Sequence, residues 1–130
     1  MAEAWAEAIL ADRRREREAL LAKARAVVED LAPAGDLLAA VVYGSVARGD
    51  FNVWSDVDLL LVMRSLPANT PDRRAALVAA APSGVQIVIW SPDDFVRAYR
   101  AGNPIAREAL AAGVVLHGDR ALQSLAGTDG

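Results

Sequence analysis

Apolar residues recur at helical spacing near the amino terminus. Residues 2–31 are mostly strong helix formers without internal glycine or proline, and Pro33 and Gly35 follow directly, which predicts one long helix. In its second half the apolar positions have the period of a helix and form one stripe, made of Leu20, Leu21, Ala24, Val27, Val28 and Leu31. A charged run at 12–18 interrupts that stripe, so we expect the first three turns to be able to project from the domain.

Two interpretations of Trp5 and Ile9, in this first half of the helix, are open. In the first, both side chains pack back onto the sheet of their own chain. In the second, they contact a partner chain, and the N-terminal helix then mediates a homo- or hetero-oligomer.

Short apolar runs rich in β-branched residues predict strands further along the chain. The expected strands are 38–43, 56–63, 85–90 and 114–116. Helices are expected at 72–81, at 92–100 after the N-cap Ser91, and at 105–112, with a turn or short helix at 44–49. The tail after Gly118 is expected to be weakly ordered.

Helices interleaved with strands predict an α/β (α+β) fold, in which helices cover a small mixed sheet of three to four strands. The run at 59–63 is apolar on both faces, as in a covered central strand. We expect a single domain over residues 1–130, with a core at about 37–118 preceded by the helix at 2–31.

Composition narrows the functional classes. The chain has 130 residues, of which 54% are hydrophobic and 24% charged, as in a folded protein. It has no cysteine, which excludes disulfides and thiolate metal sites. A net charge of -3 argues against nucleic acid as a partner. No apolar stretch is long enough for a membrane span, and the order of charges at the amino terminus is the reverse of a signal peptide, so a cytoplasmic protein is expected.

Residues 41–62, VVYGSVARGDFNVWSDVDLLLV, carry the candidate chemistry. Asp56 and Asp58 are two residues apart on a predicted strand, so both carboxylates point to one face of the sheet. Carboxylate oxygens are suitable ligands for Mg²⁺. The turn at Gly44 and Ser45 offers backbone N–H groups and a hydroxyl to a phosphate. Together these residues indicate metal-assisted chemistry on a nucleoside triphosphate.

The arrangement of strand, Gly44-Ser45, ten residues, Asp56-x-Asp58 and strand resembles the signature of the nucleotidyltransferase superfamily that includes DNA polymerase beta. The resemblance covers about residues 37–118. The short chain looks like the minimal nucleotidyltransferases that pair with HEPN proteins in toxin–antitoxin modules. It implies the nucleotidyltransferase fold, one or two Mg²⁺ ions held by the two aspartates, and ATP as substrate.

Arg48 lies within this signature and has two interpretations. It can reach a phosphate oxygen of the nucleotide, or it can pair with Asp50 on the surface.

The chain departs from the superfamily pattern on the third predicted strand. Relatives have a third acidic residue there, whereas this chain has Gln86 in the run 84–90. A glutamine amide is a weak metal ligand and cannot act as a general base. Gln86 therefore marks an enzyme that has lost activity but binds nucleotide, or Asp93 or Asp94 substitutes, or the attacking hydroxyl needs little assistance.

Other polar residues have simpler interpretations. Asp93 and Asp94 are expected to be acids of a helix first turn. His117, the only histidine, is expected to be a loop residue and not a catalytic base.

Three functions follow from the resemblance. The first is transfer of AMP from Mg-ATP to a hydroxyl of a HEPN-type partner protein. The second is a catalytically weak or inactive nucleotide-binding module that neutralises its partner by contact. The third is transfer to a small molecule, which ranks last because relatives of that kind usually carry an additional helical domain for the acceptor.

Overall fold

A computed structural model of the chain describes residues 2–52, 54–64 and 70–127. Its centre is one sheet of four strands in the order β3-β2-β1-β4. The strands are β1 (Leu37–Tyr43), β2 (Val57–Met63), β3 (Val85–Trp90) and β4 (Val114–His117). Strand β1 runs antiparallel to β2 and β4, and β2 runs parallel to β3. The predicted small mixed sheet is confirmed.

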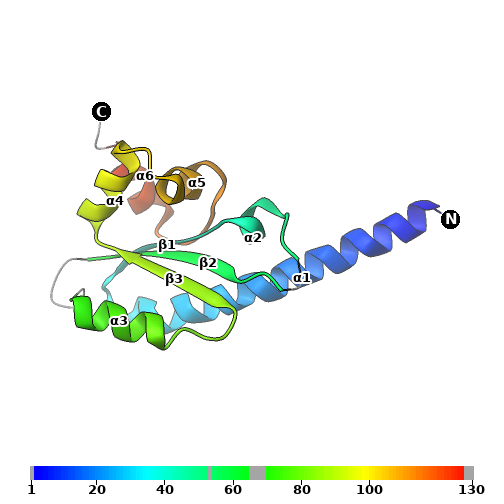
Figure 1. Ribbon diagram of the computed structural model, residues 1–130, viewed down its shortest axis with the longest axis horizontal. Helices are drawn as coiled ribbons and strands as arrows, with labels where there is room; N and C mark the ends of the chain where they lie inside the picture. Colours follow the sequence, from blue (N-terminus) through cyan, green and yellow to red (C-terminus); the bar gives the residue numbers. More distant parts are fainter. Residues whose placement is uncertain (1, 53, 65–69, 128–130) are drawn as a thin grey trace.

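Helices cover both faces of this sheet (Figure 1). The long helix α1 (Ala2–Leu31) and the short α3 (Pro71–Ala79) lie on one face, and a single 3₁₀ turn, η1 (Ala32–Ala34), leads from α1 towards β1. On the other face lie α4 (Pro92–Arg100), α5 (Pro104–Ala112) and α6 (Asp119–Gly127). The one-turn helix α2 (Ser45–Arg48) follows β1 directly. None of the helices in the described ranges is long and apolar enough to cross a membrane.

The alternation of side chains along β2 divides the core into two layers. Leu59, Leu61 and Met63 pack beneath α1 and α3, whereas Leu60 and Val62 pack beneath α4, α5 and α6. All five side chains are buried, which confirms β2 as a covered central strand. By the same alternation, even-numbered polar residues at the start of β2 and β3 face the α4–α6 layer.

The first half of α1 projects beyond the sheet (Figure 1). Trp5 is 71% exposed, Ile9 43% and Leu10 54%, whereas Leu21 and Ala24, further along the same helix, are buried. The interpretation in which Trp5 and Ile9 pack onto their own sheet is therefore wrong. Their contact with a partner chain stays a prediction.

The expectation of a weakly ordered tail after Gly118 is wrong for residues 119–127, which form α6. The helix is stabilised because Leu122 is buried against the sheet and Leu125 packs beside it. Gly118 allows the chain to turn there, with a φ of 71° and a backbone so close to Leu38 that a Cβ would lie 1.9 Å from its carbonyl oxygen. Residues 128–130 lie outside the described residues.

His117 also differs from its prediction as a loop residue. It is the last residue of β4 and pairs with Ala40 of β1. The strand therefore extends one residue beyond the predicted 114–116.

Candidate active site

The loop after β1 has a conformation that only glycine adopts readily. Gly44 has φ 78° and ψ −155°, outside the regions open to residues with a Cβ. The chain then makes the single turn of α2, in which the amide of Arg48 donates to the carbonyl of Gly44 at 3.0 Å. Gly49 closes the turn in the left-handed conformation, and its amide donates to the carbonyl of Ser45 at 2.8 Å. We call residues 44–49 the glycine loop.

Asp58 lies directly against the start of the glycine loop. A Cβ built on Gly44 would be 2.5 Å from Oδ2 of Asp58, a distance that real Cβ atoms do not tolerate. The contact arises because Tyr43, at the end of β1, pairs with Asp58 of the antiparallel β2. The sheet register thus brings one predicted metal ligand against the predicted phosphate-binding loop.

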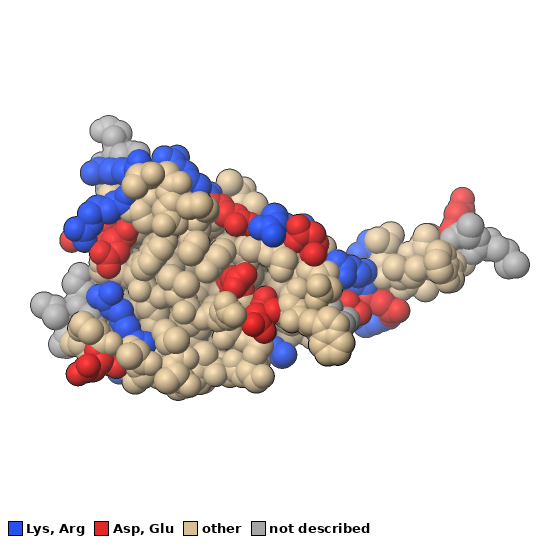
Figure 2. Space-filling view, in the orientation of Figure 1, with Lys and Arg blue, Asp and Glu red and all other residues tan. Residues whose placement is uncertain are grey.

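Asp56 and Gln86 belong to the same polar group. Asp58 and Gln86 are direct neighbours across the parallel β2–β3 pair, and Nε2 of Gln86 donates a hydrogen bond to Oδ2 of Asp56 at 3.1 Å. Asp56 precedes β2, which starts one residue later than predicted. Figure 2 shows acidic side chains gathered near the middle of this face of the molecule, over the start of β2 and β3. Gln86 therefore holds the Asp56 carboxylate through its amide nitrogen.

Burial and neighbouring charges disfavour the ionised form of Asp58. Burial raises the pKa of Asp58 most, and the negative charges of Asp56 and Glu108 raise it further, while Arg48 lowers it. The pKa of Tyr43 is also raised, first by burial and then by the charges of Asp58 and Glu108. A cation bound between the aspartates would relieve this concentration of negative charge.

Arg48 forms two ion pairs in this structure. Its Nε lies 3.2 Å from Oδ2 of Asp50, and its NH1 pairs with Oε1 of Glu108 on α5. The sequence interpretation that pairs Arg48 with Asp50 is confirmed, whereas phosphate binding by Arg48 stays a prediction. Glu108 was not predicted, since it lies 60 residues away in the chain and only the packing of α5 brings it to the glycine loop.

The donor set is suitable for Mg²⁺ with a nucleotide, but not for a metal held by protein alone. Within the described residues no three His, Cys, Asp or Glu side chains form a metal cage. Mg²⁺ is usually bound by one or two carboxylates together with substrate phosphates and water. Asp56 and Asp58 supply two carboxylates on one face of the sheet, so these residues are suitable ligands for Mg²⁺ that is bound together with a nucleotide.

Asp93 and Asp94 do not replace the missing third acid. They lie in the first turn of α4, beyond the end of β3, whereas Gln86 lies near its start. The length of β3 between them is roughly 13 Å at about 3.3 Å per residue. Asp94 fulfils its predicted role instead: its amide donates to the N-cap Ser91 at 3.1 Å, and its carboxylate accepts from Arg97 at 2.9 Å.

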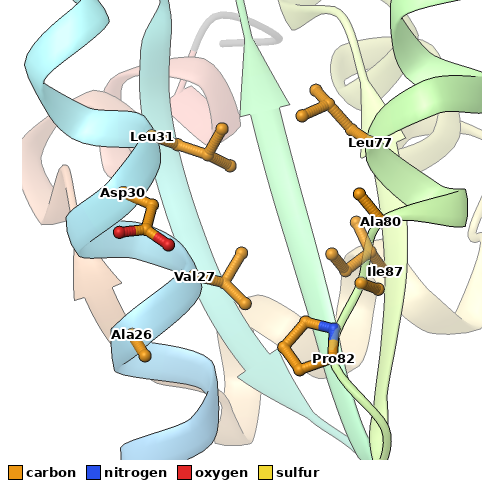
Figure 3. Close-up of a pocket in the computed structure, with 9 residues that line it drawn as sticks. Ala26, Val27, Asp30, Leu31, Leu77, Ala80, Pro82 and Ile87 are labelled. Carbon is orange, nitrogen blue, oxygen red and sulfur yellow. The ribbon is translucent and has the colours of Figure 1, made fainter.

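A separate hollow lies between α1 and α3, on the sheet face opposite to Asp58 (Figure 3). Its volume is about 230 Å³. Its lining is mostly apolar and includes Val27 of α1, Leu77 of α3 and Ile87 of β3. Asp30 of α1 is the one acidic residue that lines it. The hollow shares no residue with the aspartate site.

Comparison with known proteins identifies the family. Residues 21–100 match the family model of the nucleotidyltransferase domain. That match spans most of the chain and includes the glycine loop, both aspartates and Gln86. The chain therefore belongs to the nucleotidyltransferase domain family.

Solved structures have the same fold. A protein from Sulfolobus solfataricus, assigned to the nucleotidyltransferases, superposes with a TM-score of 0.56 at 20% identity, over 79% of this chain and 84% of that one. A toxin–antitoxin structure with AMP-PNP superposes with a TM-score of 0.55 at 16% identity, over 82% of this chain and 80% of that one. No curated protein matches the chain significantly in sequence. Family and fold together support a nucleotidyltransferase-type function.

Proposed function

We propose that this chain binds Mg-ATP at Gly44, Ser45, Asp56 and Asp58 and transfers AMP to a hydroxyl group of a partner protein. The observation that carries the proposal is the contact between Asp58 and Gly44. It puts a carboxylate able to bind a cation against a backbone loop able to receive phosphate.

Each residue has a distinct part in this reaction. Gly44 lets the triphosphate approach the backbone without a Cβ in the way, and the hydroxyl of Ser45 donates to a phosphate oxygen. Asp56 and Asp58 hold Mg²⁺, which, when bound, neutralises charge on the phosphates during an in-line displacement. Arg48 exchanges one of its carboxylate partners for a phosphate oxygen.

In the proposed transfer the acceptor oxygen forms a bond to the α-phosphorus, and the bond from that phosphorus to the bridging oxygen breaks, so pyrophosphate leaves. The acceptor proton goes to water in this proposal, because the amide of Gln86 cannot take it and both aspartates are assigned to Mg²⁺. A missing general base typically lowers the rate by roughly 10²–10⁴-fold. We therefore expect a slow enzyme.

We propose a HEPN-type protein as the partner. The toxin–antitoxin neighbour supports a toxin as the class of partner. The projecting half of α1 offers a surface for it, since Trp5, Ile9 and Leu10 are exposed there. Tryptophan is enriched among the residues that dominate binding energy at interfaces.

A second function is favoured by one observation at the site. Gln86 donates to Asp56 at the position where the resemblance implies a third acid, so the Asp56 carboxylate has a partner other than a metal ion. The chain could then neutralise its partner by contact alone, with nucleotide binding retained and catalysis lost.

One experiment separates the two functions. The protein is incubated with Mg²⁺, α-labelled ATP and a candidate HEPN-type partner protein, and label on the partner is measured together with partner activity. Transfer of AMP predicts label that disappears with Asp56→Asn or Asp58→Asn, and neutralisation should disappear with it. Neutralisation that persists in both variants, without label, would support contact alone and overturn the enzymatic proposal.

A further inference from the structure

The glycine loop is held from outside by two arginines of α1. Nε of Arg17 donates to the carbonyl of Val46 at 2.9 Å, and its NH2 donates to the carbonyl of Ala47 at 3.1 Å. NH2 of Arg13 donates to the carbonyl of Gly49 at 2.9 Å. Two side chains one helical turn apart thus satisfy three carbonyls of a six-residue loop.

These carbonyls need external donors. A helix as short as α2 leaves most of its carbonyls without an intrahelical partner. The guanidinium of Arg17 can reach two of them at once because its donors form a rigid fork. A cation at the carboxyl end of a helix also interacts favourably with its dipole.

Packing fixes Arg13 as well. Its guanidinium carbon lies 4.1 Å from the centre of the Phe51 ring, and Phe51 is buried just beyond the glycine loop. The ring face attracts the cation electrostatically and so stabilises the position of the guanidinium. The arginine is therefore anchored by the same segment whose backbone it binds.

The position of these contacts decides what they do. They act on the carboxyl side of Gly44 and Ser45, while Asp58 contacts the loop from the opposite, strand side. We propose that Arg13 and Arg17 are positioning residues, which hold the glycine loop in the conformation that receives the triphosphate. Helix α1 is then a component of the nucleotide site as well as a cover of the sheet.

This inference rests on the proposed function, and its test uses the full chain. Arg17→Gln and Arg13→Gln are compared with wild type and with Arg14→Gln, which removes the same charge from an exposed position on α1. Affinity for Mg-ATP is measured by calorimetry, and the melting temperature is measured in parallel. We expect the affinity to fall about tenfold in each loop-contacting variant and to be unchanged in Arg14→Gln.

Two further readouts separate positioning from a general loss of stability. Arg17→Lys keeps the charge but cannot span two carbonyls, so it should recover only part of the ATP affinity. Hydrogen exchange of the Gly49 and Asp50 amides, which donate to Ser45, should accelerate in Arg17→Gln while the strands stay protected.

The outcomes distinguish the inference from the proposed function. Absence of ATP binding by the wild-type protein would overturn the proposed function and this inference with it. If the wild-type protein binds ATP and both Arg13→Gln and Arg17→Gln bind it with the wild-type affinity, the inference is overturned while the proposed function stands. A lower affinity that only follows a lower melting temperature, with complete recovery in Arg17→Lys, would also contradict it.

Discussion

Gln86 donates a hydrogen bond from Nε2 to Oδ2 of Asp56 at 3.1 Å, across the parallel pair of β2 and β3. The bond holds one of the two candidate metal ligands in place without adding negative charge to the site. The amide of Gln86 thus occupies the place of a third acid and fixes the Asp56 carboxylate by a hydrogen bond. It also identifies the position at which added charge should matter most.

Replacing Gln86 with aspartate should increase both Mg²⁺ affinity and the rate of AMP transfer. The new carboxylate would face Asp56 and Asp58, where it adds a hard ligand and a group able to accept the acceptor's proton. We expect a rate increase of about 10²-fold, measured with labelled ATP. Without metal the variant should melt at a lower temperature, because three carboxylates repel one another.

The matched control is Gln86→Ala, which removes the hydrogen bond to Asp56 without adding charge. It should show no increase in rate or in Mg²⁺ affinity. A rate increase in the alanine variant would show that the hydrogen bond to Asp56, and not the missing charge, limits the rate. No increase in Gln86→Asp despite tighter Mg²⁺ binding would show that residue 86 does not limit catalysis.

Gly44→Ala should destabilise the fold and abolish ATP binding. Its Cβ would meet Asp58 Oδ2 at 2.5 Å, in a backbone conformation that side chains rarely adopt. We expect a loss of about 1–3 kcal/mol in the free energy of unfolding, measured with urea. Gly35→Ala is a matched control, since Gly35 also has a positive φ of 81° but no atom within 4 Å of its Cβ position.

The difference between these two glycine variants isolates the contact with Asp58 from backbone strain alone. Equal destabilisation would mean that the close approach of Gly44 to Asp58 contributes nothing measurable.

Local patterns predicted the sheet well because its strands are short apolar runs between turn residues. The strand at 85–90 is found at its predicted bounds, and those at 38–43 and 56–63 differ by one residue at one end. Asp58 lies in β2 as predicted and is a direct neighbour of Gln86, whereas Asp56 precedes the strand and is joined to Gln86 by a hydrogen bond.

Contacts between segments that are far apart in the sequence could not be predicted from local sequence patterns. Helix α6 was missed because Leu122 is buried only once the sheet face is formed. The partners of the glycine loop were missed for a similar reason: Arg17 lies 29 residues before Val46, and no spacing within either segment indicates their contact. The charged residues at 12–18 indicated only an interrupted stripe, whereas in the structure two of them, Arg13 and Arg17, donate hydrogen bonds to backbone carbonyls.

Asp58→Asn should make the protein more stable at neutral pH. Burial raises the folded-state pKa of Asp58 above its ordinary value of 3.8, so the folded state binds more protons than the unfolded state between those two values. The free energy of unfolding contributed by this group therefore falls as pH rises through that window. An amide avoids the cost of the buried charge.

We expect Asp58→Asn to raise the melting temperature by about 2–4 °C at pH 7. The gain should decrease as pH falls and vanish towards about pH 3, where the wild-type carboxyl is largely protonated in both states. Glu7→Gln, on the exposed part of α1, should leave the melting temperature unchanged at either pH. A gain that stays constant from pH 3 to pH 7 would contradict this account, because it could not come from ionisation of Asp58.

Replacing Trp5 and Ile9 together with serine should weaken binding of the partner protein without changing the stability of the chain. Both side chains are exposed on the projecting half of α1, so their removal leaves no cavity in the core. We expect partner affinity to fall about 10–100-fold, measured by calorimetry, because buried aromatic anchors dominate interface energies. Val78→Ser is the control, since Val78 is an exposed apolar residue on α3, away from the projecting turns. Unchanged affinity in the double variant, with the control also unchanged, would show that the partner binds elsewhere.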